Sequence, residues 1–504
     1  MGEDAASVIV VGGGPTGLLL AGDLAGAGIH VRVLEKRSLE SNLTRAFALH
    51  ARSLEYLDAR GVADELVAEG FPVPEVHADF GGGRVASVDL RHPESRFPFV
   101  LMIQQAGTER LLLERAERLG AEIVRGSEVV DLQQDEAGVT LKVRDGGGGE
   151  GDRLQRALYV VGADGAHSVV RDRLGVAFRG SSYRTHLLLA DVRLREPLPR
   201  AINPFIGDDG VALLPPYGDG WFRATIWDRE RRDIPLEAPL GFDEVADALS
   251  RISGGALTLE ELRWSTRFLS ERRQARHYRM GRGFLAGDAA HVHSPMGAMG
   301  MSVGLQDAGN LSWKLAAAVR GGEPKWLLES YESERQPVAR GTLMLSDLIL
   351  RAATAPAFMR GLRAAIVPAL LRLEGVQDRA RLLVSGLGYR YARPRQVPSA
   401  SKIGERAPDL SLTIAGSRER LYAMMDGIRF LLIDASADGR FAHEAAPWAD
   451  RLIILQDQGP LDDGMLALLI RPDAHLAWTG EAYGEGSAGA LREALEAWLG
   501  SAGG

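Results

Sequence analysis

The 504-residue sequence contains no cysteine. This absence excludes disulfides, catalysis by a thiolate, metals bound by cysteine and redox relays built from two thiols. Any electron transfer in this protein must therefore run through a bound cofactor.

Positive charge is also scarce: 59 Lys and Arg stand against 67 Asp and Glu, a formal net charge of −8. No basic stripe is present that would follow a phosphate backbone, so nucleic acid is not expected as a partner. The apolar stretch near the N-terminus follows Glu3 and Asp4 and contains Gly and Pro, which predicts neither a signal peptide nor a membrane span. We expect a cytoplasmic protein of two or three domains.

Glycine, in contrast, is abundant, and its first informative cluster is the run Gly-Gly-Gly-Pro-Thr-Gly at residues 12–17. An apolar run typical of a buried parallel strand precedes it at residues 8–11, and the start of an apolar helix follows it. In such a unit Gly12 permits a tight turn, Gly14 lets the backbone approach a pyrophosphate and Gly17 allows close helix packing. Because the helix N-terminus also offers free N–H groups to an anion, the cluster predicts a dinucleotide site.

A second strand, at residues 31–34, ends in Glu35. An acidic side chain there accepts the hydroxyls of an adenosine ribose and repels a 2′-phosphate, so the bound nucleotide should be of the FAD or NAD kind rather than NADP. Arg45 follows in a loop. It is either a cation that reaches the cofactor or a solvated surface arginine.

The second cluster, Gly-Ala-Asp-Gly at residues 162–165, joins a buried strand at residues 158–161 to a helix at residues 169–174. Gly162 and Gly165 would give the backbone room to press against a dinucleotide. The alternative is an ordinary helix cap formed by Asp164, in which case Arg171 would lie on the surface.

The third cluster begins at Gly287-Asp288, where Asp288 ends a buried strand and can bind a ribityl hydroxyl. A glycine-broken loop at residues 295–302 then leads into a long helix. The positive end of that helix would stabilise negative charge on a reduced flavin. His291 and His293 alternate as metal ligands might, but no third ligand is suitably spaced, which favours a structural role and no metal.

Between the second and third clusters the sequence changes to short β runs, at residues 185–192, 210–214 and 221–227. Turn signals separate them, as expected for an inserted antiparallel sheet with one face on a substrate cavity. Arg223, on one of these runs, would either orient a phenolate substrate or lie on the surface.

The C-terminal third begins with leucine-rich helical sequence around residues 348–373. Such a helix packs on the first domain or on a partner subunit, as in a homodimer; the alternative is a helix that lies on a membrane surface. A proline-containing linker follows at residues 393–408. Three apolar runs, at residues 430–433, 451–455 and 467–470, then predict core strands, and residues 491–499 a closing helix.

Taken together, the three clusters resemble the FAD-dependent aromatic hydroxylases of the p-hydroxybenzoate hydroxylase type, and among these the aromatic polyketide and rifampicin hydroxylases with a C-terminal thioredoxin-like domain. The resemblance spans nearly the whole chain and includes the stretch Gly-Leu-Gln-Asp-Ala-Gly-Asn-Leu-Ser-Trp-Lys-Leu at residues 304–315. It implies an α/β protein: a Rossmann-like FAD-binding domain (1–175 and 276–395), an inserted antiparallel-sheet substrate domain (176–275, with 72–104 contributing) and a thioredoxin-like domain (400–504) that lacks thiol activity.

The resemblance further implies a monooxygenase. NADPH or NADH, as a transient co-substrate, would reduce the flavin, O2 would add at C4a, and the hydroperoxyflavin would hydroxylate an aromatic or polyketide-type small molecule. The flavin performs the chemistry, so no catalytic residue is expected beyond a substrate-orienting Arg223. The residues that the sequence and the resemblance assign to cofactor binding are Gly12, Gly14, Pro15, Thr16, Gly17, Glu35, Lys36, Arg45, Gln105, Asp164, Asp288, Pro295, Gly297, Ala298, Gly300, Met301 and Ser302.

The loop at residues 297–302 departs from the Gly-Gly-Gln-Gly-x-Asn pattern of such enzymes, with Ala298, Met299 and Ser302 in place of Gly, Gln and Asn. Gln104 also stands where Pro is frequent. We therefore hypothesise that FAD is held more loosely, or that its ring moves differently. Two alternatives to hydroxylation stay open: Baeyer-Villiger oxidation or epoxidation on the same scaffold, and a flavin-binding protein that no longer turns over.

Overall fold

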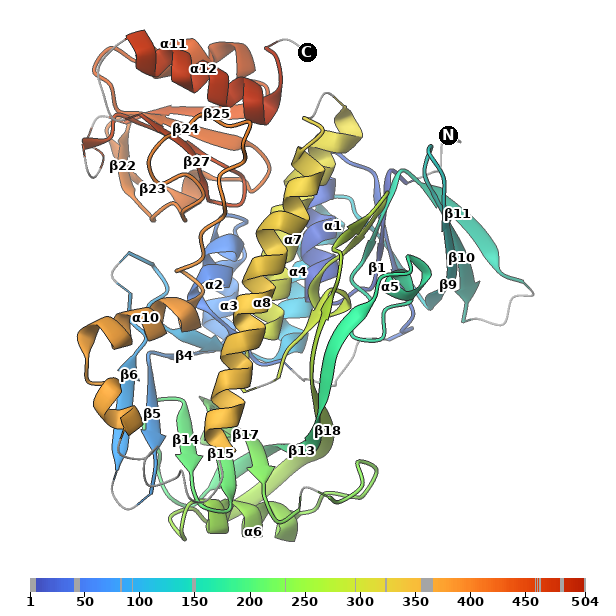
Figure 1. The fold of residues 1–504 in the computed structure, drawn as a ribbon, viewed down its shortest axis with the longest axis vertical. Helices are drawn as coiled ribbons and strands as arrows, with labels where there is room; N and C mark the ends of the chain where they lie inside the picture. Colours follow the sequence, from blue (N-terminus) through green and yellow to red (C-terminus); the bar gives the residue numbers. More distant parts are fainter. Residues whose placement is uncertain are drawn as a thin grey trace.

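The computed structural model describes residues 6–39, 46–81, 84–92, 94–146, 151–231, 233–294, 296–321, 324–354, 366–457, 459, 461, 464–480 and 485–502. Arg45 and Pro295, two of the expected cofactor contacts, lie outside these residues. Three main sheets, of six, nine and four strands, and two long helices organise the described chain (Figure 1).

The first domain is built on a six-stranded sheet whose central strands run parallel and are almost fully buried, as their apolar sequences predict. Its order is β19 (Arg279–Met280), β20 (Gly283–Leu285), β12 (Tyr159–Gly162), β1 (Val8–Val11), β2 (Val31–Glu35) and β8 (Glu122–Arg125). Val11 pairs with both Leu34 and Gly162, so the carboxyl ends of three strands from distant parts of the sequence meet at one edge. Ligands bind at such an edge in open α/β sheets.

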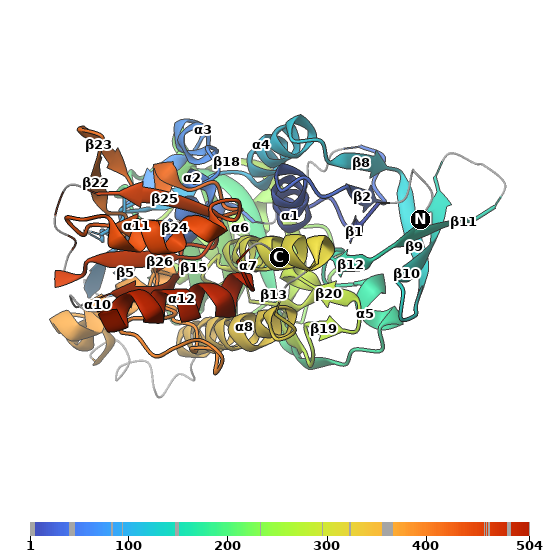
Figure 2. The same ribbon diagram turned by 90° about the horizontal axis from the view of Figure 1, so that it is seen from above.

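Helices and a small sheet cover this core. α1 (Pro15–Gly26) packs beside α7 (Gly300–Arg320) and α4 (Gln105–Arg118), while α2 (Ala51–Asp58), α3 (Ala63–Glu69) and α5 (Val169–Arg173) are shorter. β3 (Ala48–Leu49), β7 (Val100–Met102) and β4 (Phe71–Val73) form a three-stranded sheet. The hairpin expected at residues 128–143 is present as β9 (Ser127–Gln134) and β10 (Val139–Asp145), with β11 (Arg153–Ala157) beside β10, at the edge of the molecule opposite the C-terminal domain (Figures 1 and 2).

The middle sheet has nine strands and is larger than the expected short runs. β13 (Phe178–Leu194) and β18 (Leu259–Ala275) are each 17 residues long, because both continue from the middle sheet back towards the first domain. The order is β21 (His291–Val292), β18, β13, β17 (Trp221–Asp228), β15 (Gly210–Leu214), β14 (Asn203–Ile206), β5 (Glu75–Asp79) and β6 (Val85–Asp89), with β16 (Pro216–Gly218) beside β17.

The two faces of this sheet have different neighbours. Phe222, Ala224 and Ile226 pack on α6 (Phe242–Ile252), whose amphipathic sequence supplies the apolar side. Trp227, on the opposite face, packs with Met296 and with Leu350 of α8 (Leu327–Ala353). The sheet therefore turns one face, called the inner face below, towards the loop at residues 296–299 and the long helix.

The C-terminal region after α10 (Glu374–Ser385) forms a separate layer, whose main sheet has the order β25 (Leu452–Gln456), β24 (Phe430–Asp434), β26 (Ala467–Ile470) and β27 (Leu476–Gly480). β24 and β25 are parallel and the other pairs antiparallel, and α11 (Arg440–Ala445) and α12 (Glu485–Leu499) cover the sheet, with the small hairpin β22 (Ser411–Ile414) and β23 (Ser417–Arg420) nearby. Within the described chain, no helix is long and apolar enough to cross a membrane.

Candidate functional site

The first and second glycine clusters touch each other. A Cβ atom at Gly12 would lie 2.3 Å from the carbonyl oxygen of Ala163, and Gly12 has a φ of +107°. Both observations require glycine, because an L side chain would clash with the second cluster and strain the turn. Gly17 packs equally closely, since its Cβ would lie 2.0 Å from the carbonyl oxygen of Gly12.

The third cluster joins the first at Thr16, the second residue of α1. Its hydroxyl oxygen lies 2.8 Å from the position of a Cβ at Gly287 and 2.4 Å from one at Gly304. Gly304 belongs to α7, so two helix N-termini lie close to one turn. The three clusters, more than 100 residues apart in sequence, therefore meet at the N-terminus of α1.

The space beside this junction fits a dinucleotide. Among the described residues, no atom lies within 4 Å of where a Gly14 Cβ would stand, although its φ of −82° would suit any residue. The backbone of Gly14 is therefore open to a ligand. Asp164 contributes a buried Oδ1 without a hydrogen-bond partner, and burial raises the pKa of its carboxyl. Asp288 is exposed on the single turn η1 (Gly287–Ala289).

Glu35 lies at the carboxyl end of β2, where an adenosine ribose would bind. Its carboxylate accepts hydrogen bonds from the Gly13 backbone N–H at 2.7 Å and from the Arg37 N–H and Nε at 2.8 and 2.9 Å. Burial acts to raise the pKa of Glu35, but these donors outweigh it and the pKa lies below its usual value. Lys36, which the sequence pointed to, is exposed, whereas the side chain that pairs with Glu35 is that of Arg37, which the sequence did not single out.

Gln105 opens α4 beside this site and contacts the segment next to Arg45. Its Oε1 accepts from the Ala46 N–H at 3.3 Å, and its Nε2 donates to Glu109 at 2.7 Å. These bonds hold the side chain in a defined orientation.

The second cluster leads into α5, and the side chains of Asp164 and Ser168 accept hydrogen bonds from the first turn of that helix. Oδ2 of Asp164 accepts from the Val170 N–H at 3.1 Å, while Ser168 is the cap of α5 and accepts from the Arg171 N–H at 3.0 Å. A Cβ atom at Gly162 would lie 2.8 Å from the Cβ of Val170. Gly162 therefore makes room for Val170, and the expectation that it gives clearance to a ligand was wrong. Gly165, with a φ of +82°, opens into free space.

Arg171 is buried instead of lying on the surface. Its Nη1 donates to the carbonyl oxygens of Ala166 at 3.0 Å and Ala289 at 3.3 Å, and its guanidinium lies over the Phe178 ring at 3.9 Å. Arg171 thus ties the second cluster to the turn that carries Asp288.

Asp307 in α7 is the main residue that sequence reasoning missed. Fully buried, it accepts from the Gly287 N–H at 3.1 Å, from His291 Nε2 at 2.6 Å and from Arg335 Nε at 2.7 Å. Burial acts to raise the pKa of Asp307, but His291 and Arg335 hold it below its usual value. His291 therefore has the structural role expected of it. No three potential metal ligands gather anywhere in the described chain.

The loop before α7 carries backbone strain at Ala298, the position where the pattern given with the resemblance has glycine. Ala298 has a φ of +52°, in the left-handed region, and its carbonyl oxygen accepts from His50 Nε2 at 3.3 Å. Ser302 points inward: its Oγ accepts from the His50 backbone N–H at 3.2 Å. Gly300 and Met301 form the first turn of α7, where helix N–H groups are available to an anion, and Gly297 precedes them with a φ of +150°.

The inner face of the middle sheet presents a buried polar group next to this loop. Arg223 is 3% exposed and donates to Asp191 at 2.5 and 3.2 Å, so its interpretation as a surface residue was wrong. Tyr217 packs in the same apolar cluster as Ala298, and its buried hydroxyl has no hydrogen-bond partner among the described residues. Burial raises the pKa of Tyr217 to about 12. The buried Thr225 hydroxyl, also on the inner face, has no partner in the described part of the chain either.

Comparisons with known proteins agree with this geometry. Residues 5–346 match the FAD binding domain family, and residues 400–502 match the aromatic-ring hydroxylase C-terminal family. A 12-dehydrotetracycline 5-monooxygenase/anhydrotetracycline 6-monooxygenase of Streptomyces rimosus is 35% identical, with 98% of each chain covered. A rifampicin monooxygenase of Streptomyces venezuelae is 37% identical, with 98% of this chain and 99% of that one covered. The solved structure of an anhydrotetracycline hydroxylase from Streptomyces rimosus has a TM-score of 0.84 at 34% identity, with 99% of this chain and 100% of that one covered.

Proposed function

The chain belongs to the FAD-dependent aromatic-ring hydroxylases, and from this premise we propose that it uses NAD(P)H and O2 to hydroxylate an aromatic polyketide-type substrate. Family membership confirms the expected resemblance, the α/β fold and FAD as the cofactor. The observation that carries the proposal is the meeting of the three clusters at Thr16, beside the open backbone of Gly14.

In this proposal each cluster has a task toward FAD. The N-terminus of α1 and the Gly14 backbone bind the pyrophosphate, Glu35 the adenosine ribose and Asp288 the ribityl chain. The first turn of α7 faces the flavin ring, where the positive end of a 21-residue helix stabilises negative charge. When bound, FAD would supply the electron transfer from NAD(P)H to O2 and the insertion of one oxygen atom.

The substrate would bind between the loop at residues 296–299 and the inner face of the middle sheet. Apolar side chains such as Phe47, Met296 and Trp227 exclude water there, and the unpartnered hydroxyls of Tyr217 and Thr225 can bond a substrate oxygen. Arg223, fixed by Asp191, would orient a phenolate through its charge. The tetracycline-type and rifampicin substrates named for the relatives support a multi-ring aromatic substrate.

Oxygenation is tested by kinetics and isotope labelling. The purified protein should be yellow and should oxidise NADPH or NADH faster when an aromatic polyketide such as anhydrotetracycline is added, with one ¹⁸O from ¹⁸O2 in the product. Equal amounts of hydrogen peroxide and oxidised NAD(P)H, with no labelled product across a panel of such substrates, would contradict the proposal.

Gly14→Ala tests the cofactor site itself. The added methyl meets no atom of the described residues, so the fold should be unchanged, yet FAD affinity should fall at least tenfold because the methyl occupies the ligand's space. Gly241→Ala is the matched control, since Gly241 is also a helix N-cap with an extended conformation and an open Cβ position, but on α6. Equal FAD affinity in both variants would refute the placement of the pyrophosphate.

A further inference from the structure

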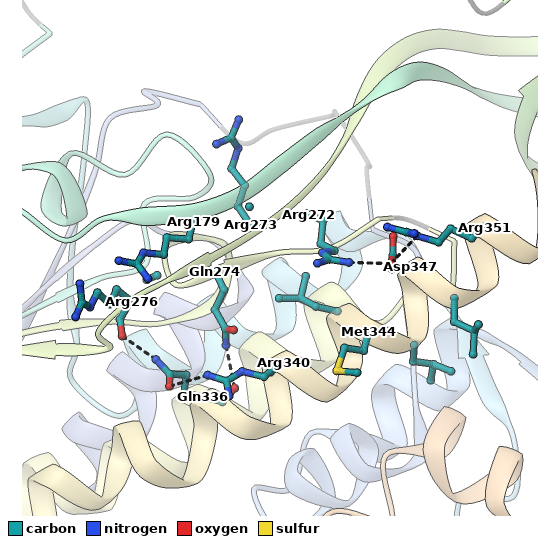
Figure 3. Close-up of a pocket in the computed structure, with 15 residues that line it drawn as sticks. Arg179, Arg272, Arg273, Gln274, Arg276, Gln336, Arg340, Met344, Asp347 and Arg351 are labelled. Atoms are coloured by element: carbon teal, nitrogen blue, oxygen red, sulfur yellow. Dashed lines mark hydrogen bonds and ion pairs between the residues drawn. The ribbon is translucent and has the colours of Figure 1, made fainter.

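A groove of about 940 Å³ lies between α8 and the paired strands β13 and β18 (Figure 3). Its strand wall contains Arg179, Arg272, Gln274 and Arg276, and its helix wall runs from Gln336 to Arg351. Arg273 also borders the groove, but its side chain points away from the helix.

The groove is strongly basic in a protein of net charge −8. Its lining includes six arginines and a single acid, Asp347. Asp347 already pairs with Arg272 at 2.7 Å and with Arg351 at 2.9 Å, and Arg273 pairs with Glu271 at 3.0 Å.

Three guanidinium groups are left over. Arg179, Arg276 and Arg340 have no carboxylate partner in the described part of the chain, and the only side-chain bond of Arg340 there is a long one, 3.4 Å, to Gln336 Oε1. They come from three different segments: Arg179 and Arg276 lie on the strand side of the groove and Arg340 on its helix side (Figure 3). A guanidinium fork suits the oxygens of a phosphate, which it can bind two at a time, so the three can contact separate phosphate groups of one extended ligand.

The rest of the groove suits a nucleotide. Met344 and Leu348, each 64% exposed, line the helix side of the groove and offer an apolar surface for a flat ring. The side-chain amide of Gln274 donates to the Gln336 carbonyl oxygen at 2.9 Å and leaves its own carbonyl oxygen as an acceptor.

The groove is also close to the flavin site. Gln274 pairs with His291, two residues beyond the turn that carries Asp288. Arg179 follows Phe178, the ring beneath Arg171, which itself holds the Ala289 carbonyl oxygen. On the helix side, Gln336 follows Arg335, the partner of Asp307. Each side of the groove is therefore adjacent, in sequence or in strand pairing, to residues that contact the turn carrying Asp288.

We propose that this groove binds the phosphate groups of the nicotinamide dinucleotide, and that it binds NADPH in preference to NADH. The inference rests on the proposed function, which requires such an electron donor. The sequence contains one strand–glycine–helix nucleotide unit, assigned above to FAD, so a second dinucleotide needs a site of another kind. Three unpaired arginines match the pyrophosphate together with the additional 2′-phosphate of NADPH.

The test is the rate of flavin reduction by NADPH and NADH in stopped-flow experiments on the FAD-loaded protein. In Arg179→Ala, Arg276→Ala and Arg340→Ala, the apparent Kd for NADPH should rise about tenfold each while the limiting reduction rate and the FAD content stay constant. The Kd for NADH should rise less, so the preference for NADPH should shrink. Arg340→Lys should restore part of the affinity. Arg379→Ala, an exposed arginine on α10 outside the groove, is the matched control and should change nothing.

A competition experiment identifies the ligand. Adenosine 2′,5′-bisphosphate should compete with NADPH in the wild type and lose affinity in the Arg340→Ala variant, whereas the same concentration of inorganic phosphate should not compete. Equal competition by inorganic phosphate would mean a general anion site and overturn the proposal. So would unchanged NADPH affinity in all three alanine variants while the wild type is reduced normally. Failure of the wild type to be reduced by either donor would instead refute the proposed function.

Discussion

Arg471 offers the sharpest test of how the C-terminal domain supports the flavin domain. It donates to both oxygens of Glu334 in α8 at 2.8 and 2.7 Å and to both oxygens of Asp473 at 2.9 and 2.5 Å. All three side chains are at most 3% exposed. Asp473 also accepts from Asn310 in α7 at 2.9 Å, so this ionic cluster joins the C-terminal domain to both long helices.

Arg471→Met should lower the free energy of unfolding by about 3–5 kcal/mol, because it leaves two buried carboxylates with too little compensating charge. Lys314, 2.8 Å from Glu334, offsets part of this loss and places the expected value nearer the lower end. The flavin should be released in the same transition, since Arg335, beside Glu334, holds Asp307 and through it the Gly287 N–H.

The measurement is urea unfolding followed by tryptophan and flavin fluorescence. Arg492→Met is the control: it removes an exposed ion pair with Glu444 in the same domain and should cost under about 1 kcal/mol. In the double variant Arg471→Met/Glu334→Gln the losses should fall short of additive by about 1–3 kcal/mol. A loss under 1 kcal/mol in Arg471→Met, or flavin release that precedes unfolding equally in both single variants, would refute the reasoning.

Three further predictions concern the site. Tyr217→Phe should raise the KM for the aromatic substrate about 5- to 10-fold by removing one hydrogen bond to the substrate. Stability should not fall, because the hydroxyl bonds no group of the described residues; a fall in stability with an unchanged KM would count against a role in substrate binding. Ala298→Gly should raise the free energy of unfolding by about 0.5–1 kcal/mol in chemical denaturation, because the strain released at a left-handed φ exceeds the conformational entropy that glycine adds to the unfolded chain. A loss of stability would show that the strain argument fails. Burial lowers the pKa of His50 to about 4, so the folded state keeps this imidazole neutral while the unfolded chain takes up a proton below about pH 6.5. Stability should therefore fall as the pH drops from 6.5 to 4, by up to about 3 kcal/mol from this group, and His50→Gln should flatten that slope by close to one proton; identical pH profiles would contradict it.

The sequence was most informative where local backbone chemistry decides the structure. The strand at residues 8–11, the glycine turn after it and Glu35 at the next strand end could all be predicted, because each follows from a few neighbouring residues. The hairpin after residue 127 could also be predicted, because alternating apolar residues flank a segment with turn-forming residues.

Long-range partners could not be predicted in the same way. Arg171 and Arg223 look like surface arginines in sequence, and only tertiary structure brings Ala289 to the one and Asp191 to the other. Asp307 lies within a largely apolar helix. A buried acid at such a position must have a polar partner, but the sequence does not show which residue that partner is. At Gly162 the sequence suggested a contact that the fold does not provide. The glycine turn predicted space for a ligand, but that space is filled by Val170, eight residues further along the chain.

The contact of Gly304 with Thr16 also has a consequence for synthesis. During translation the segment that forms the first glycine turn is synthesised long before α7, whose Gly304 packs against Thr16. Asn310 is likewise synthesised long before its partner Asp473. We therefore expect the vitamin-derived group to bind only after α7 has been synthesised and has packed on the N-terminal turn.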